Sequence, residues 1–100
     1  MDEGKIVWSS RAENELLLVL EFYINRNGNT RYSTKLLDKI EKLVALLPNY
    51  PSLGYLTENK VTRVVVKEDF LIFYEVSTAS IKIVSFWDAR QDPEKRIDKS

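Results

Sequence analysis

The fold is decided by residues 61–87, which read VTRVVVKEDFLIFYEVSTASIKIVSFW. This stretch contains three runs of mainly β-branched and aromatic side chains, at residues 61–67, 70–76 and 80–87. Such runs favour β-strands. Only Glu68-Asp69 and Ser77-Thr78-Ala79 separate them, and connections this short are typical of hairpins. The stretch therefore predicts a three-stranded antiparallel meander.

Two helical patterns precede the meander. The first runs from about Arg11 to Asn27 and the second from about Thr30 to Leu47, each with apolar residues recurring at the spacing of a helical turn. The break between them contains Gly28, which tolerates the left-handed conformation that commonly ends a helix. Because the break is short, it predicts an antiparallel helical hairpin.

The residues before the first helix, Lys5 to Trp8, read as a short strand, and Ser9 or Ser10 can cap the helix that follows. Residues 48–54 are rich in turn formers and are predicted to be irregular. The predicted fold class is therefore α+β: an N-terminal strand, an antiparallel helical hairpin, then a three-stranded antiparallel meander, with the helices packed on one face of the sheet.

The length of 100 residues predicts a single domain over residues 1–100. The residues after the last strand are charged and poor in apolar side chains. From about residue 91 the tail is therefore predicted to be mobile or ordered only by a partner.

The composition limits the chemistry open to this chain. It has no Cys and no His, which excludes disulfides, thiolate chemistry and histidine-dependent catalytic triads. Fifteen basic and fifteen acidic residues cancel, so any contact with nucleic acid must rest on a local patch. No secretory or membrane-spanning segment is recognisable, so we expect a cytoplasmic protein with no cofactor, no metal and no membrane partner.

Three segments carry a resemblance to a known family. They are the helix opening Ser10-Arg11-Ala12-Glu13-Asn14-Glu15-Leu16, the turn Pro51-Ser52-Leu53-Gly54 and the ending Phe86-Trp87-Asp88-Ala89-Arg90. In this order and spacing they resemble the first helix, the PxxG turn and the last strand of the ParE branch of the RelE/ParE toxin superfamily. The resemblance covers about residues 5 to 93.

The resemblance implies a growth-inhibiting toxin of a type II toxin–antitoxin system, which inhibits DNA gyrase and is neutralised by a cognate antitoxin protein. Occupancy of a protein surface, rather than chemistry, would be its mechanism. An alternative is a RelE-like endonuclease, with the ribosome and messenger RNA as partners. Arg63, Lys82 and Arg90 would then stabilise the scissile phosphate. RelE-like members are strongly basic, so this neutral chain favours the ParE-like function. A further alternative is a non-toxic interaction domain with the same fold.

This chain departs from the family at two places. Glu68-Asp69 occupies a hairpin turn that often contains Gly in the family, so the turn geometry can differ. The family also often has His before the terminal Arg, whereas Trp87-Asp88 precedes Arg90 here.

Arg63, Trp87 and Arg90 are the candidate target-binding residues. Each has a structural alternative: a cross-strand ion pair with Glu75 or Asp69 for Arg63, core packing for Trp87, and a local salt bridge for Arg90. Lys82 has the alternative of an ordinary solvated strand residue.

Leu18 and Phe22 widen the apolar surface of the first helix beyond a single stripe, so they are candidates for binding the antitoxin. The alternative is that both are buried, because a helix that touches a sheet and a second helix needs a broad apolar face. The five tyrosines do not suggest a catalytic set, since an ordinary phenol is poorly matched to acid–base work near neutral pH.

Overall fold

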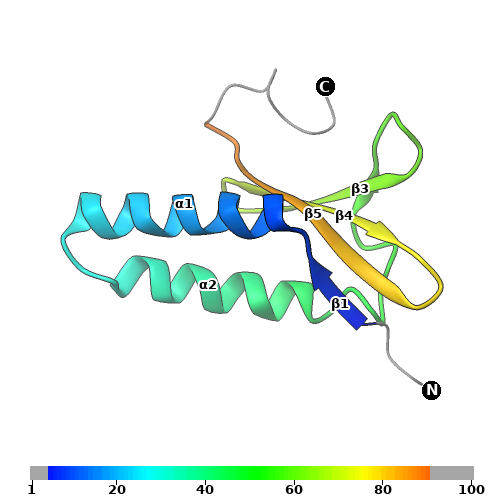
Figure 1. The fold of residues 1–100 in the computed structure, drawn as a ribbon, viewed down its shortest axis with the longest axis horizontal. Helices are drawn as coiled ribbons and strands as arrows, with labels where there is room; N and C mark the ends of the chain where they lie inside the picture. Colours follow the sequence, from blue (N-terminus) through cyan, green and yellow to red (C-terminus); the bar gives the residue numbers. More distant parts are fainter. Residues whose placement is uncertain (1–4, 91–100) are drawn as a thin grey trace.

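A computed structural model describes residues 5–90 of the protein. The elements are β1 (Lys5–Trp8), α1 (Ser10–Asn27), α2 (Arg31–Val44), β2 (Tyr55–Leu56), β3 (Thr62–Lys67), β4 (Phe70–Val76) and β5 (Ser80–Asp88) (Figure 1). The predicted α+β class, with its strand, helical hairpin and meander, is confirmed. The prediction of a mobile tail concerns residues outside the described range.

The strands form one mixed sheet in the order β1-β5-β4-β3-β2. β1 runs parallel to the first half of β5, from the pair Lys5 and Ser80 to the pair Trp8 and Ile83. All other neighbouring strands are antiparallel. β2 is absent from the sequence prediction, because two residues are too few to show an alternating pattern.

Local signals fix the helix ends. Ser9 caps α1, its side chain accepting a hydrogen bond from the amide of Ala12, and Gly28 follows α1 with a left-handed φ of 72°. α2 ends at Val44 rather than at the predicted Leu47. The chain tightens there into turns with i to i+3 hydrogen bonds, because Pro48 has no N–H and restricts the residue before it.

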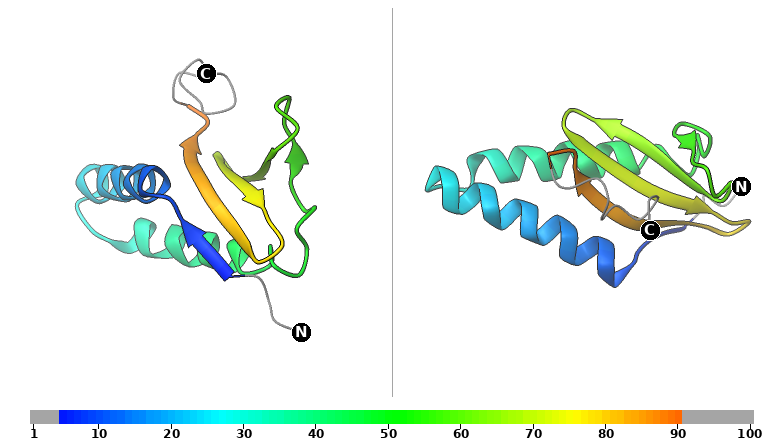
Figure 2. Two further views of the ribbon diagram at one scale, coloured as in Figure 1. Left: turned by 45° about the vertical axis from the view of Figure 1, so that its right-hand side comes forward. Right: turned by 90° about the horizontal axis from the view of Figure 1, so that it is seen from above.

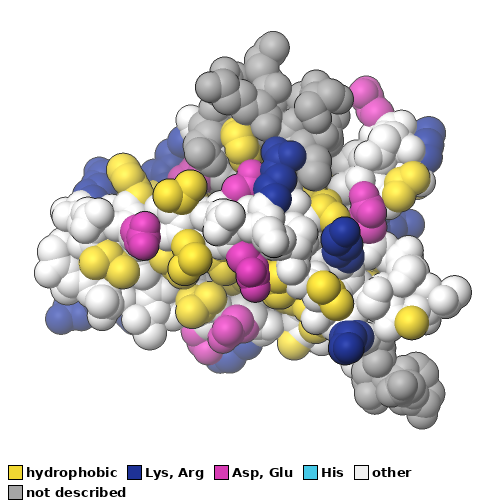
Figure 3. All heavy atoms as spheres, in the orientation of Figure 1, with side chains coloured by type: hydrophobic (Ala, Val, Ile, Leu, Met, Phe, Trp, Pro, Cys, Tyr) yellow, Lys and Arg dark blue, Asp and Glu magenta, His cyan; other side chains and the backbone are white. Residues whose placement is uncertain are grey.

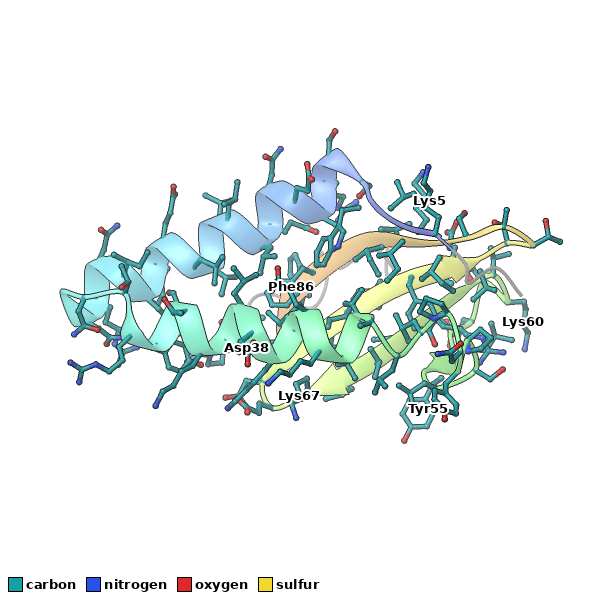
Figure 4. All side chains as sticks on the ribbon, turned by 90° about the horizontal axis from the view of Figure 1, so that it is seen from below. Lys5, Asp38, Tyr55, Lys60, Lys67 and Phe86 are labelled. Carbon is teal, nitrogen blue, oxygen red and sulfur yellow. The ribbon has the colours of Figure 1, made fainter. Side chains whose placement is uncertain are left out.

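The two helices lie side by side against one face of the sheet (Figure 2). Figure 4 shows Phe86 on β5 between α1 and α2. The core on this face combines apolar residues of both helices and of β3, β4 and β5: Ala12, Leu16, Val19, Tyr23, Leu36, Ile40, Val44, Leu47, Val65, Phe70, Ile72, Tyr74, Ile81, Ile83 and Phe86.

A second, smaller apolar cluster forms from the residues that alternate with the core positions: Leu71, Phe73, Val84 and Trp87. Both faces of β5 are therefore partly covered. The register between β4 and β5 shifts after Phe73, leaving Val84 as an extra residue on β5. This bulge changes the alternation of side chains in the second half of β5.

Candidate functional site

β1 covers only half of the outer edge of β5. The backbone leaves this edge at Ser9, whose amide donates to the carbonyl of Ile83 at 2.9 Å. Beyond that point the side chain of Glu15, on α1, takes the place of a strand. Its Oε1 accepts hydrogen bonds from the Ser85 hydroxyl at 2.7 Å and the Phe86 amide at 3.0 Å. Half of the β5 edge therefore has a helix as its neighbour.

Glu15 is a structural residue that sequence reasoning did not single out. It also forms an ion pair with Arg11 one turn earlier on α1, at 3.2 Å. A signal for it was present, because Glu15 falls at helical spacing between Ala12 and Val19, both of which face the core. A carboxylate within an apolar stripe requires partners, since burying it alone would be unfavourable.

A groove of about 680 Å³ lies between α1 and the last part of β5. Its walls are formed by Glu15, Leu18, Val19, Phe22, Arg26, Trp87, Asp88 and Arg90. Leu18 and Phe22 remain 66% and 54% exposed, so the structural alternative in which both are buried is wrong. Figure 3 shows further hydrophobic side chains at the surface of the helical hairpin.

Arg90 lies at the end of this groove. Its guanidinium forms a two-point ion pair with Asp88, with Nε–Oδ1 and Nη2–Oδ2 distances of 2.9 and 2.7 Å. It also lies over the ring of Tyr23, 5.4 Å from the ring centre. The predicted local salt bridge is thus present, and it holds the guanidinium at the edge of the groove.

Trp87 is only 7% exposed, so the predicted core packing is present as well. It belongs to the small cluster with Leu71, Phe73 and Val84, and it also lines the groove. Its indole Nε1 is buried and has no hydrogen-bond partner among the described residues.

Arg63 lies elsewhere, at the β2 end of the sheet. The expected ion pair with Glu75 or Asp69 is wrong, because the Arg63 Nη1 donates instead to the Gly54 carbonyl at 2.9 Å. Glu75 accepts a hydrogen bond from Thr62 at 3.1 Å. The register explains the error: Arg63 pairs with Tyr74, one residue from Glu75, and adjacent residues point to opposite faces.

The PxxG turn is closed by Tyr74. The phenol donates to the Pro51 carbonyl and accepts from the Gly54 amide, both at 2.8 Å. A Cβ on Gly54 would lie 2.6 Å from the Val64 carbonyl oxygen, so only Gly fits. The Gly of the PxxG motif is therefore required because any larger side chain would collide with β3.

The three residues proposed for a nuclease are not brought together. Arg63 is bound to the turn at the β2 end, and Lys82 is an exposed residue in the first half of β5. Arg90 follows the far end of β5, and the six residue steps from Lys82 to Asp88 along the strand span about 20 Å. A single phosphate cannot contact all three side chains in this arrangement.

The β3–β4 hairpin is tied to α2 by an exposed ion pair, with Lys39 Nζ 2.8 Å from Glu68 Oε2. The hydrogen bond to Lys39 lowers the pKa of Glu68, and the same bond raises the pKa of Lys39. Glu68 has a φ of 55°, in the left-handed region that favours Gly. Burial, followed by the charge of Glu68, raises the pKa of the nearby Tyr32.

Within residues 5–90, no helix is long and apolar enough to cross a membrane. No group of three or more Asp or Glu side chains in this part of the chain could hold a metal ion. The described surface carries a largely apolar groove between α1 and the last part of β5.

The strand, the helical hairpin and the mixed sheet define a small α+β domain of the class that the resemblance implies. The family profile described as "ParE toxin of type II toxin-antitoxin system, parDE" matches residues 6–93. The chain therefore belongs to the ParE toxin family of type II toxin–antitoxin systems.

Structural comparison supports the same fold. The chain is similar to a protein of the solved structure "Chromosomal ParDE TA system from P. aeruginosa", with a TM-score of 0.77 and 18% sequence identity. The match covers 88% of this chain and 98% of that chain. No match was found among curated proteins.

Proposed function

We propose that this ParE-like toxin inhibits DNA gyrase and that a cognate antitoxin neutralises it by binding in the α1–β5 groove. The observation that carries the antitoxin site is the exposure of Leu18 and Phe22 along this groove. Side chains four residues apart on a helix lie on the same face, so both can contact one amphipathic segment. Family membership supports the antitoxin as partner.

Gyrase inhibition is favoured over messenger cleavage by the placement of the basic residues. A nuclease would need cations gathered around one phosphate, and Arg63 is committed to a backbone carbonyl of the turn. A chain with balanced charge also has a weak long-range attraction for ribosomal RNA. Binding to a protein target needs neither feature.

The target is tested by adding the purified protein to a gyrase supercoiling reaction and, in parallel, by sequencing messenger ends from cells that express it. We expect supercoiling to fall, with growth arrest in the expressing cells. Messenger cleavage at ribosomal A sites with unaffected gyrase would replace this proposal with the RelE-like nuclease. A protein that neither arrests growth nor affects either target would be the non-toxic interaction domain.

The antitoxin site is tested with Leu18→Arg, because Arg and Leu have similar helix propensities and the position is exposed. The matched control is Leu17→Arg, the preceding residue of α1. Leu17 is 53% exposed but lines a separate hollow between α1 and α2. Leu18→Arg should weaken antitoxin binding by at least about tenfold. Equal affinities for the two variants would place the antitoxin elsewhere.

A further inference from the structure

The small cluster of Leu71, Phe73, Val84 and Trp87 is buried although the helices lie on the other face of the sheet. Phe73 is 0% exposed, and the other three are at most 8% exposed. All four lie on β4 or β5, and the partly buried residue packed against them, Val64, lies on β3. Side chains stand roughly perpendicular to a sheet, so neighbouring strands cover their flanks but not their ends. A further segment must therefore lie over this part of the sheet.

The exposure of neighbouring residues shows where this cover lies. Cross-strand partners share a face, so Val66 lies beside Leu71, and Tyr55 lies beside Val64. Val66 is 54% and Tyr55 is 76% exposed, whereas Leu71 is 8% exposed. Exposure therefore falls steeply between β3 and β4. The cover lies over β4 and β5 and leaves β2 and β3 open.

The elements within residues 5–90 do not supply this cover. Both helices pack on the opposite face (Figure 2). The turn Pro51–Gly54 is bound by Tyr74, whose side chain belongs to the core on the helix side. The connections after β2, β3 and β4 are turns between neighbouring strands of the sheet itself. The segment over the cluster therefore comes from outside this range.

The positions of the two chain ends decide which segment this is. β5 ends at Asp88, next to Trp87, and residues 91–100 continue the chain from there. Ten extended residues reach about 33 Å, far more than the spacing of about 5 Å between neighbouring strands. Lys5 instead pairs with Ser80, at the other end of β5. A segment preceding Lys5 would have to follow the strand for about 23 Å before it reached Trp87.

We propose that residues 91–97 turn back across β5 and β4 and cover the small cluster, with Ile97 as the apolar contact of Phe73. Ile97 is the one large aliphatic side chain of a segment that otherwise carries mainly charges. The tail then belongs to the fold of the free toxin and is not ordered only by a partner. It also supports the α1–β5 groove, because Trp87 belongs to the cluster and lines this groove. This arrangement depends neither on the target nor on the antitoxin site.

The direct test uses the free, unmodified toxin. With the δ1-methyl groups of isoleucine labelled, the variant Ile97→Val identifies the Ile97 signal by its loss. We expect nuclear Overhauser contacts from this methyl group to the rings of Phe73 and Trp87. An Ile97 methyl signal at the position of an unstructured chain, with no contact to either ring, would overturn the proposal.

Thermal unfolding gives a second measurement. Ile97→Asp places a charge over the apolar cluster and should lower the thermal midpoint by about 5 °C or more. The matched control is Ser100→Asp, which adds the same charge to the tail outside the proposed contact. It should leave the midpoint within about 2 °C of the natural value. Equal midpoints for the two variants would contradict the role of Ile97.

Two other occupants of this sheet face give different results. If a second copy of the chain covers the cluster, Ile97 makes no contact with the rings and the protein sediments as a dimer. If a partner orders the tail, the contacts of Ile97 appear only after the antitoxin is added. Either result overturns the proposal.

Discussion

Two buried aromatic residues, Tyr74 on β4 and Trp87 on β5, belong to the two apolar clusters on opposite faces of the sheet and use their polar atoms differently. The Tyr74 hydroxyl donates one hydrogen bond and accepts another, and both close the turn that contains Gly54. The Trp87 indole has no partner among the described residues and lies at an open groove. The first arrangement closes a turn of the fold, and the second lies at the groove that we propose as a binding site.

The two candidate arginines follow the same division. Arg63 donates to the Gly54 carbonyl and belongs to the closed turn. Arg90, half exposed, stands beside the groove and is held there by Asp88 and Tyr23. The same residue type therefore stabilises a closed turn in one place and lines the groove in the other. Substitutions at the turn should therefore change stability, and substitutions at the groove should change binding.

The largest effect is expected for Gly54→Ala. Its Cβ would collide with backbone atoms of Val64, which cannot move without disturbing β3. We expect a loss of about 3 kcal/mol, near the top of the range for overpacking, and a thermal midpoint more than about 10 °C lower. Thermal unfolding followed by circular dichroism measures this.

Gly28→Ala is the control for Gly54→Ala. Here φ is 72°, but a Cβ would meet nothing within 4 Å. The variant should lose only about 1 kcal/mol, from left-handed strain alone. Equal effects at the two glycines would mean that backbone conformation, not the contact with Val64, fixes Gly54.

Tyr74→Phe should have the next largest effect on stability. It removes the hydroxyl and leaves the Gly54 amide and the Pro51 carbonyl without their partner, which costs about 2 kcal/mol. Tyr50→Phe, at an exposed tyrosine, should be neutral. Chemical denaturation gives the free energy of unfolding of both variants. A Tyr74→Phe protein as stable as the natural one would show that water replaces the hydroxyl.

Much of this fold could be predicted, because its signals are local. The strand runs, the helical stripes and Gly28 each act within a few residues, and all appear where they were expected. β2 could not be predicted, since its two residues become a strand only through pairing with β3. The end of α2 was placed three residues too late, because the turns after Val44 keep hydrogen bonds resembling those of a helix.

The site was harder to predict because it depends on contacts far apart in the sequence. Leu18 and Phe22 could be nominated from the width of the apolar surface on α1, but their exposure depends on where β1 ends. The partners of Arg63 and Glu15 lie 9 and 70 or more residues away and depend on strand register. Side-chain type indicated that these residues needed partners, but not which ones.

Arg90→Glu tests the groove end of the comparison. The change removes an ion pair and a cation–π contact at an exposed position, so we expect a loss of about 1 kcal/mol and a midpoint about 5 °C lower. Toxicity should fall strongly, because reversing the charge replaces attraction to an acidic target site with repulsion. Growth arrest and thermal unfolding are measured on the same variant. A fully toxic Arg90→Glu protein would remove Arg90 from the target-binding surface.

The smallest effect is expected at Glu68, in a hairpin that belongs to neither region. Glu68→Gly relieves the left-handed strain of a φ of 55° but loses the exposed ion pair with Lys39. Surface ion pairs contribute little, so the midpoint should rise by a few degrees at neutral pH.

The pH dependence separates these two contributions. Because the pKa of Glu68 is lowered, the stability that its charge contributes through the ion pair is present above the usual carboxyl pKa. This contribution is lost as pH falls through the lowered value. Because the pKa of Lys39 is raised, the stability that its charge contributes is lost as pH rises through the raised value. The stability advantage of Glu68→Gly over the natural protein should therefore be smallest near neutral pH and grow toward acid.

Glu68→Gln keeps the strained backbone and lacks the charge, so it should be slightly less stable than the natural protein at neutral pH and equal to it in acid. Midpoints of the three proteins across this pH range measure both terms, and a Glu68→Gly midpoint below that of Glu68→Gln would show that the turn is not strained.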